Sequence, residues 1–181
     1  MIWLYPTDTL FGLGADATDP AAIAVLRELK GSPGEKHISI VVADLAMMRQ
    51  YAEVTPLAEK LAAAFLPGKL TLVLNAKNLP KDLSEDGTIG IRIPNHPVPL
   101  ALVRKLGKPI TATSANVSGQ RCMMSVPEIH DQFGDKYYLL KREDEWPMWL
   151  PPSAPSTVVD ARGDTPIVIR EGAITTQQIF F

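Results

Sequence analysis

The chain has 181 residues, of which 46% are apolar and 21% are charged, a balance that is ordinary for a globular protein. Its 18 Lys and Arg residues against 20 Asp and Glu residues give a formal net charge of -2, which argues against generic attraction to nucleic acid as the leading property. The single cysteine excludes an intrachain disulfide, no run of about 18 apolar residues indicates a membrane helix, and the N-terminal MIWLYPTDTL does not resemble a signal peptide. We therefore expect one domain over residues 1–181, located in the cytoplasm and not bound to a membrane.

Helix-start signals recur along the chain. Asp19-Pro20 and Thr55-Pro56 each place a capping side chain before a proline of the first turn, and apolar residues at helical spacing follow both. The first helix is expected to end at Gly31 and the second before Pro67-Gly68. Further helices are predicted from Asp44 to about Tyr51, over residues 98–106, and from Ser125 onward.

Short apolar and β-branched runs between these helices predict strands. The predicted strands cover residues 2–5, 38–42, 70–74, 89–93, 109–113, 137–140, 157–160 and 167–170. Residues 145–155 contain four prolines and predict a loop. Because strands and helices alternate irregularly, we predict an α+β fold, a three-layer α/β arrangement in which helices flank a twisted mixed sheet.

Polar side chains gather where the predicted strands end, and ligands of open sheets bind at such ends. Ser, Thr, Asn and Asp also bond their own backbone in turns, which explains each residue taken alone. Taken together, they predict a ligand site. These residues are Thr7, Asp8, Thr9, Arg92, Thr111, Thr113, Ser114, Asn116, Ser118, Ser156, Thr157 and Arg170.

Residues 111–119 read as a strand that becomes a hydroxyl-rich turn and ends in glycine. Small side chains there would let a ligand approach backbone N–H groups, which suits a phosphate or a carboxylate. The segment lacks the lysine and the spacing of a P-loop. Gly12-Leu13-Gly14 lacks the third glycine of a dinucleotide-binding fingerprint, because Ala17 stands at that position.

Arg92 is predicted to lie on the opposite face of its strand from the three isoleucines of residues 89–93. A guanidinium on a half-buried strand needs a carboxylate or phosphate partner, which is either a ligand or an internal ion pair. Arg170 poses the same alternatives, with Glu171 as a neighbouring partner.

The remaining reactive side chains give weaker signals. Lys30 and Lys36 flank a Gly- and Pro-containing loop that either closes over an anionic ligand or leaves its lysines solvated. The three histidines and the single cysteine have no metal-ligand spacing, so no metal site is expected. Cys122 has no His or Asp partner in sequence and reads as a plain thiol rather than a nucleophile.

Several motifs, taken in chain order, resemble one known family, the YrdC-like threonylcarbamoyl-AMP synthases. The likeness covers nearly the whole chain, and the set of motifs is far more specific than any single one. The motifs are YPTDT at residues 5–9 with GLG at 12–14, KGSP at 30–33, IRIPNHP at 91–97, ATSANVSG at 112–119, STVVD at 156–160 and IREGAI at 169–174.

The resemblance implies a fold similar to that of dihydroxybutanone phosphate synthase, with a large concave basic cavity. It implies a nucleotidyltransferase that joins L-threonine, bicarbonate and ATP, with Mg2+, into threonylcarbamoyl-AMP and pyrophosphate. It also implies a downstream threonylcarbamoyl transferase complex that modifies tRNA to N6-threonylcarbamoyladenosine, and weak tRNA binding by the synthase.

The resemblance further assigns residues, without naming a general base. The L-threonine site would comprise Thr9, Arg92, Ala112 and Ser156, with Arg92 pairing with the carboxylate and Ala112 acting through its backbone. The ATP site would comprise Lys30, Ser32, Lys36, Thr88, Ser114, Asn116, Cys122 and Arg170.

The sequence departs from the family pattern in three places. Ser32 stands where relatives carry the arginine of Lys-x-Arg, so one cation expected near the triphosphate is missing. Residues 146–152 replace a glycine-rich stretch, which leaves the lid over the threonine pocket open to question. The chain also starts almost at its first predicted strand and resembles the short, single-domain type of synthase.

Two other functions remain as alternatives. The first is an RNA-binding module that uses the same cavity without catalysis, suggested by the missing arginine. The second is a divergent paralogue, which either forms a related carbamoyl-adenylate on a different acceptor or has only a structural role.

Overall fold

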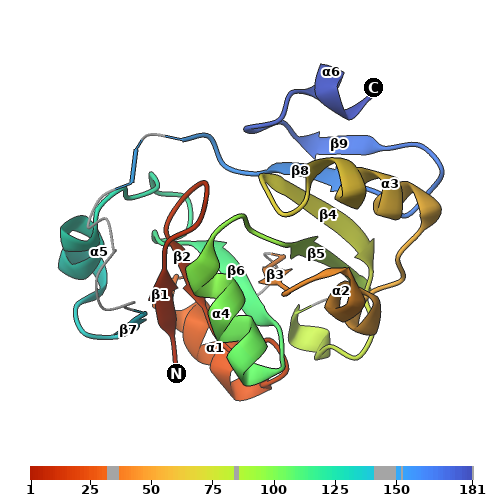
Figure 1. Ribbon diagram of the computed structural model, residues 1–181. Helices are drawn as coiled ribbons and strands as arrows, with labels where there is room; N and C mark the ends of the chain where they lie inside the picture. The colour runs from red at the N-terminus through yellow and green to blue at the C-terminus, as the bar shows by residue number, and fades with distance from the viewer. Residues whose placement is uncertain (32–36, 84–85, 141–149, 152, 181) are drawn as a thin grey trace.

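The strands of the protein form one mixed sheet. The computed structural model describes residues 1–31, 37–83, 86–140, 150–151 and 153–180. Within these ranges the sheet has nine strands in the order β7-β1-β2-β6-β3-β5-β4-β8-β9 (Figure 1). The strands are β1 (Trp3–Tyr5), β2 (Gly12–Gly14), β3 (Ser39–Val41), β4 (Leu70–Asn75), β5 (Thr88–Arg92), β6 (Ile110–Ser114), β7 (Tyr138–Leu139), β8 (Thr157–Asp160) and β9 (Ile167–Arg170). The pairs β1–β7, β3–β5 and β4–β8 are parallel and the other neighbours are antiparallel, which confirms the predicted mixed sheet.

The helices begin where the capping signals predicted. The side chain of Asp19 accepts a hydrogen bond from the N–H of Ala21, and that of Thr55 accepts one from Ala58. Asp44 and Ser125 cap their helices in the same way. The helices are α1 (Pro20–Leu29), α2 (Leu45–Tyr51), α3 (Pro56–Phe65), α4 (Pro97–Leu106), α5 (Val126–Phe133), α6 (Thr176–Ile179) and the 3-10 helix η1 (Lys81–Leu83). The sequence did not predict α6 or η1.

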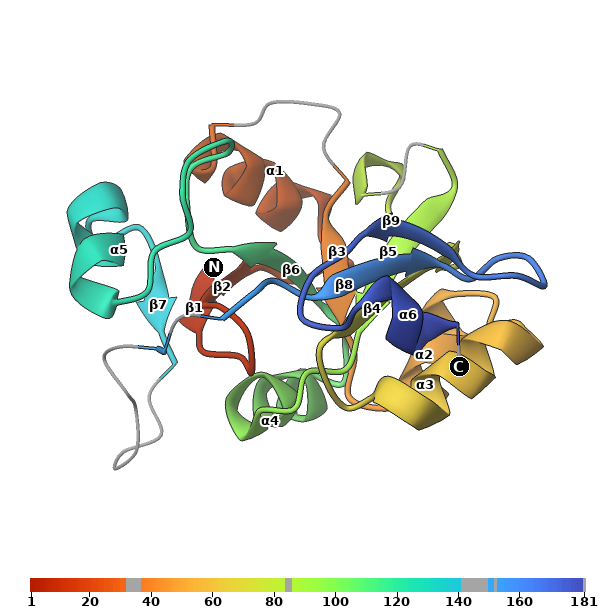
Figure 2. The ribbon, with the colours of Figure 1, turned by 90° about the horizontal axis from the view of Figure 1, so that it is seen from above.

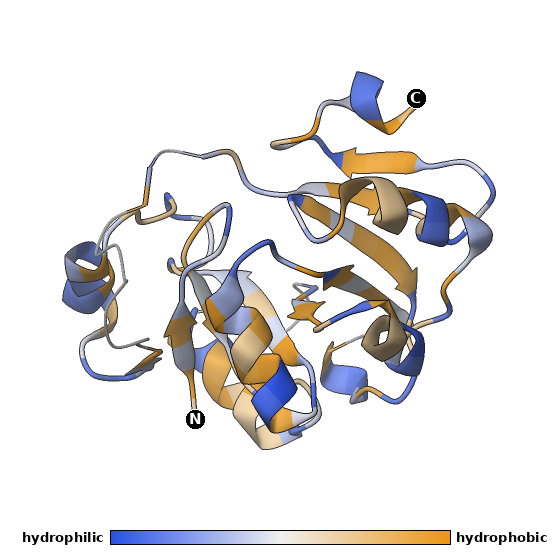
Figure 3. Ribbon diagram, viewed as in Figure 1, coloured by the Kyte–Doolittle hydropathy of each residue, from blue (hydrophilic) through white to orange (hydrophobic). Residues whose placement is uncertain are grey.

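Along β1 and β3, alternate side chains divide between two apolar clusters. Leu4 and Ile40 belong to the larger cluster, to which α1, α2, α3 and α5 also contribute. Tyr5, Val41 and Ile110 belong to the smaller cluster, which α4 completes. Figure 2 shows α1 and α4 on opposite sides of the strands β1, β2 and β6, and Figure 3 shows the apolar character of most of β4 and β9. Burial of the side chains in the two clusters supplies most of the stabilisation of the fold, whereas Ile167 and Ile169 of β9 are exposed.

Strand β2, which the sequence did not predict, depends on the ring of Tyr5. A Cβ atom added to Gly12 would lie 2.6 Å from Cε2 of Tyr5, and one added to Gly14 would lie 2.6 Å from the carbonyl oxygen of Thr111. The Tyr5 hydroxyl donates a hydrogen bond to that same carbonyl oxygen at 3.1 Å. Only glycine therefore fits at both positions, and the two glycines mark a close approach of strands rather than a nucleotide-binding loop.

None of the helices in the described ranges has the length and apolar character needed to span a bilayer.

Candidate functional site

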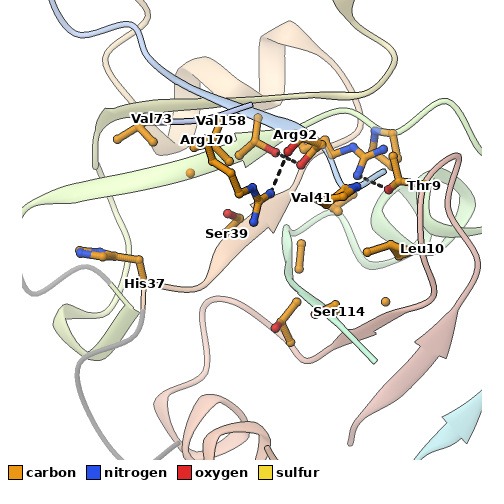
Figure 4. A pocket seen from close by; sticks show the side chains of 18 of the residues that line it. Thr9, Leu10, His37, Ser39, Val41, Val73, Arg92, Ser114, Val158 and Arg170 are labelled. Atoms are coloured by element: carbon orange, nitrogen blue, oxygen red, sulfur yellow. Dashed lines mark hydrogen bonds between the residues drawn. The ribbon is translucent and has the colours of Figure 1, made fainter. Parts of the chain in front are cut away.

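A cavity of about 610 Å³ lies on the same face of the sheet as α4 (Figure 4). Tyr5 and Val41 line the cavity and also pack in the cluster that α4 completes. Alternate residues of β4 and β5 form part of the wall, including Thr71 and Arg92. The three isoleucines of residues 89–93 lie in the larger cluster, so Arg92 faces the cavity as predicted.

The backbone registers bring together segments that are far apart in sequence. In β4, Leu72 pairs with Ile91 of β5, and Leu70 pairs with Thr157 of β8. The end of β5 and the residue that precedes β8 therefore meet beside the start of β4. Arg92, Thr71 and Ser156 gather there, next to the loop that follows β1.

Arg92 is held by hydrogen bonds from all three of its nitrogens. Nη2 donates to Oδ1 of Asp8 at 2.6 Å, Nη1 donates to Oγ1 of Thr9 at 2.8 Å, and Nε donates to the carbonyl oxygen of Gly68 at 3.0 Å. Figure 4 shows the guanidinium beside Thr9. These contacts leave N–H groups on both terminal nitrogens for a ligand carboxylate. Arg92 thus forms an internal ion pair and also lines the cavity.

The electrostatics at Arg92 are those of a buried pair. The residue is 8% exposed, and burial lowers its pKa while Asp8 and Tyr5 raise it. Burial also raises the pKa of the Tyr5 phenol far above its ordinary value, so this hydroxyl stays protonated. Oδ2 of Asp8 is buried without a hydrogen-bond partner in the described part of the protein. Arg92 is therefore the cation that balances the buried carboxylate.

A second buried polar pair lies beside Arg92. The hydroxyls of Thr71 and Ser156 are 2.8 Å apart and share a hydrogen bond. Nη2 of Arg170 donates to the carbonyl oxygen of Ser156 at 2.8 Å, which fixes this residue from the opposite side. Glu171, considered as a partner for Arg170, accepts hydrogen bonds from Thr176 instead.

The opposite end of β5 is held by contacts that are local in sequence. Thr88 is as buried as Arg92, at 8% exposed, and its neighbours Asp86 and Arg162 are exposed. The backbone N–H and the hydroxyl of Thr88 both donate to the carboxylate of Asp86, and these bonds lower the pKa of Asp86. Arg162 donates to both carboxylate oxygens of Asp160 and lowers its pKa in the same way. Asp86, Asp160 and Arg162 thus bring charges of both signs to this part of the cavity, where His37 also lies (Figure 4).

The turn after β6 differs from the anion cradle that its sequence suggested. The N–H of Ala115 donates to Phe11, that of Asn116 to Ser114, that of Val117 to Gln132 and that of Ser118 to Lys30. Because these donors already have partners within the protein, the backbone of residues 115–118 does not offer them to a ligand.

Most of the predicted site residues that the structure describes line one cavity. They are Thr9, Arg92, Ala112 and Ser156 of the expected threonine site, and Thr88, Ser114, Cys122 and Arg170 of the expected ATP site. Lys30 and Asn116 lie behind the wall and do not line it. Ser32, Lys36 and the lid positions 146–149 and 152 fall outside the described residues.

Sequence reasoning missed other lining residues, notably Ser39, Thr71 and Asp86. Thr71 had a recognisable signal, because it is the polar residue in a strand whose leucines at 70, 72 and 74 all face the larger cluster. Among the described residues, no group of three or more His, Cys, Asp or Glu side chains could hold a metal ion.

Comparison with known proteins shows which family this chain belongs to. A family model described as Telomere recombination, Sua5_yciO_yrdC, matches residues 1–172. A Bacillus subtilis (strain 168) protein named Threonylcarbamoyl-AMP synthase is 34% identical over 180 residues, which are 97% of this chain and 51% of that protein. A Mycobacterium tuberculosis (strain CDC 1551 / Oshkosh) protein named Putative threonylcarbamoyl-AMP synthase is 36% identical over 179 residues, 96% of this chain and 79% of that protein.

A solved structure shows the same fold. The crystal structure of P. abyssi Sua5 complexed with L-threonine superposes with a TM-score of 0.87 at 31% identity, and the match covers 98% of this chain. It covers 52% of the P. abyssi chain, so this chain spans about half the length of that protein and of the Bacillus relative. The likeness confirms the predicted α+β fold with a twisted mixed sheet and flanking helices.

Proposed function

The chain belongs to the Sua5/YciO/YrdC family, and from this premise we propose that it is an L-threonylcarbamoyladenylate synthase with one YrdC-like domain over residues 1–181. The enzyme would condense L-threonine, bicarbonate and ATP into threonylcarbamoyl-AMP and pyrophosphate. The observation that carries the proposal is the Arg92 guanidinium, which is fixed by the protein yet keeps N–H groups for a carboxylate inside the cavity. A relative with 31% identity over most of this chain has been solved with L-threonine bound.

In the proposed complex, Arg92 binds the carboxylate of L-threonine through charge-assisted hydrogen bonds. Thr9 and Ser156 flank it, and Ala112 approaches through its backbone. The buried Asp8 and Thr71 keep these groups in place before the ligand arrives. A site fixed in this way loses little conformational freedom on binding.

ATP would occupy the rest of the cavity, toward the Thr88 end of β5. Thr88, Ser114 and Cys122 line this part. Arg170, which is bonded to the carbonyl oxygen of Ser156, would supply a cation for the phosphates from beside the threonine site. Ser32 and Lys36, which lie outside the described residues, remain part of the proposed ATP site. Asn116 does not line the cavity and would act indirectly, through its hydrogen bonds with Ser114 and Cys122 in the turn.

The reaction would proceed in two steps. The threonine amine adds to bicarbonate and water leaves, which gives a carbamate. A carbamate oxygen then attacks the α-phosphorus of ATP, and pyrophosphate departs. The protein's part is to orient the carbamate and to neutralise phosphate charge, which are the main sources of acceleration in such transfers. Mg2+ would enter bound to the triphosphate and offset its charge.

The product would pass to a threonylcarbamoyl transferase complex that modifies tRNA in the cytoplasm. Because the formal net charge is -2, any tRNA binding by this chain is expected to be weak and to decline steeply with salt.

The proposal is tested by measuring pyrophosphate release from MgATP in the presence of L-threonine and bicarbonate, with L-serine as the control amino acid. Release should require both co-substrates. Arg92→Ala should lower the rate at least about 100-fold, because losing a charge-paired anchor costs several kcal/mol. Arg104→Ala, at an exposed position of α4, should leave the rate unchanged. Folded protein that releases no threonine-dependent pyrophosphate would contradict the proposal and favour an RNA-binding role.

A further inference from the structure

Lys30 follows the last residue of α1 and is nearly sealed from solvent. It is 6% exposed, and its Nζ donates hydrogen bonds to the carbonyl oxygens of Ser114 at 2.6 Å and Asn116 at 2.7 Å. Its own carbonyl oxygen accepts a hydrogen bond from the N–H of Ser118 at 3.0 Å. An ammonium group is costly to bury unless acceptors surround it. Lys30 therefore ties the end of α1 to the turn that follows β6, through its side chain and its backbone.

The same turn carries part of the cavity wall. Ser114 and Cys122 line the cavity, and both donate to Oδ1 of Asn116, Cys122 through its Sγ at 3.9 Å. Nδ2 of Asn116 donates to the carbonyl oxygens of Val117 and Gln120, each at 2.9 Å. Any movement of Asn116 would therefore move both lining side chains.

We infer that Lys30 is a positioning residue, whose buried ammonium fixes the turn at residues 114–118 and, through Asn116, sets Ser114 and Cys122 in the wall of the nucleotide half of the cavity. The inference deepens the proposed function, on which it rests for the identity of the ligand. The geometry itself requires no nucleotide.

This role differs from the direct ATP contact that the family resemblance implies. Lys30 does not line the cavity, and its Nζ is directed at two carbonyl oxygens. Because Lys30 is 6% exposed and does not line the cavity, Nζ would have to move to reach a phosphate, and this movement would strain or break its bonds to the two buried carbonyl oxygens. The two roles therefore predict different reactivities of Cys122 and Lys30 in the protein without nucleotide.

The single cysteine supplies a readout that needs no ligand, because Cys122 lies in the wall that Lys30 is inferred to hold. Lys30→Met keeps the side-chain length and removes the donors. Its Cys122 should react with an aromatic disulfide at least about tenfold faster than in the unsubstituted protein, because the turn loses two hydrogen bonds from a charged group and each is worth at least about tenfold. Lys105→Met, at an exposed position of α4, should react at the unsubstituted rate. Urea unfolding establishes that each variant is folded.

Kinetics separate positioning from general weakening of the fold. In Lys30→Met the KM for ATP should rise about tenfold while the KM for L-threonine changes less than about twofold, because the affected wall faces the nucleotide. An unchanged Cys122 rate together with a raised KM for ATP would overturn the inference and assign Lys30 a direct phosphate contact.

A measurement on the unsubstituted protein keeps the inference open to refutation even if Lys30→Met does not fold. Lysine acetylation by an activated ester, mapped by mass spectrometry, should leave Lys30 protected relative to Lys105, both with and without MgATP. Labelling of Lys30 at the rate of Lys105, with protection only by MgATP, would contradict the inference. The nucleotide-free readouts also separate the two proposals, since a protected Lys30 in a protein that does not bind ATP would refute the proposed function alone.

Discussion

Arg92 and Thr88 stand at opposite ends of β5, and the protein holds them by different means. Arg92 bonds to Asp8 and Thr9, which lie 84 and 83 positions away in sequence. Thr88 bonds to Asp86, which lies 2 positions away. The same contrast holds at the two ends of β8. Ser156, just before the strand, bonds to Thr71, which lies 85 positions away, whereas Asp160 bonds to Arg162, which lies 2 positions away.

We call Asp8, Thr9, Thr71, Arg92 and Ser156 the anchored end of the cavity, and Asp86, Thr88, Asp160 and Arg162 the open end. The anchored end is buried and fixed by folding, which suits a small group with one geometry, such as an amino-acid carboxylate. At the open end Asp86 and Arg162 are exposed, while Thr88 and Asp160 are as buried as Arg92 and Asp8. The contacts of this end are local in sequence and can rearrange with little cost to the core, which suits a larger ligand that enters and leaves. The difference supports placing L-threonine at the first and ATP at the second.

Breaking the buried ion pair should have the largest effect. Asp8→Asn leaves the Arg92 charge without its counter-charge, and breaking a buried pair on one side costs about 3–5 kcal/mol. The free energy of unfolding in urea should fall by about that amount. The KM for L-threonine should rise at least about tenfold, because the guanidinium loses the contact that orients it.

Asp135→Asn is the matched control, since its side chain is fully exposed. It should change neither quantity. A variant Asp8→Asn with the stability and the threonine KM of the unsubstituted protein would show that the anchored end does not depend on this pair.

Two isosteric threonine substitutions test whether the two ends of the cavity bind different substrates. Thr71→Val removes the hydrogen bond to Ser156 and should cost about 1 kcal/mol of stability, with a few-fold rise in the KM for L-threonine only. Thr88→Val removes the bond to Asp86 and should raise the KM for ATP instead. If both variants change the same KM, the two ends do not bind different substrates.

A smaller effect is expected on the pH dependence of the stability of the fold. His96 caps α4, and its Nδ1 accepts a hydrogen bond from the N–H of Val98. Burial lowers the pKa of His96 below its ordinary value of 6.5, although Asp8 opposes this. The unfolded chain therefore binds the proton first, so stability should decline as the pH falls below about 6.5 and be unaffected by this group at higher pH.

His96→Asn keeps a capping side chain that does not titrate, so its stability should lose this part of the pH dependence. The measurement is urea unfolding between about pH 5 and pH 8. His130→Asn, at an exposed position of α5, should keep the slope. An unaltered slope in His96→Asn would assign the pH dependence to another group.

The smallest effect is expected at the open end. The Arg162 side chain is 43% exposed, and exposed ion pairs contribute little. Arg162→Ala should therefore change the free energy of unfolding by less than about 0.5 kcal/mol. A loss comparable to that of Asp8→Asn would show that the two ends are equally rigid.

The contrast between local and distant contacts also explains what the sequence could predict. Asp19 and Thr55 were recognised as caps because a cap depends on the next three residues. The orientation of Arg92 followed from the period of two in its strand. Its partner Asp8 could not be assigned, because strand pairing rather than sequence distance brings the two residues together.

Strand β2 and the turn after β6 were misread for a related reason. Two glycines in three residues disfavour a strand, and only the distant Tyr5 ring and Thr111 carbonyl make them necessary. The sequence suggested that the N–H groups of residues 115–118 could bind a ligand. In the structure they donate hydrogen bonds within the protein, among others to the carbonyl oxygens of Phe11 and Lys30. In both places a tertiary contact decided what local sequence left open.

The most direct test of this account is calorimetric titration of the protein with L-threonine and with L-threoninol, which lacks the carboxylate. We expect that the unsubstituted protein binds L-threonine and not L-threoninol, and that the Arg92→Ala variant binds neither. Binding of L-threonine to folded Arg92→Ala with unchanged affinity would contradict the claim that the anchored end receives the amino-acid carboxylate.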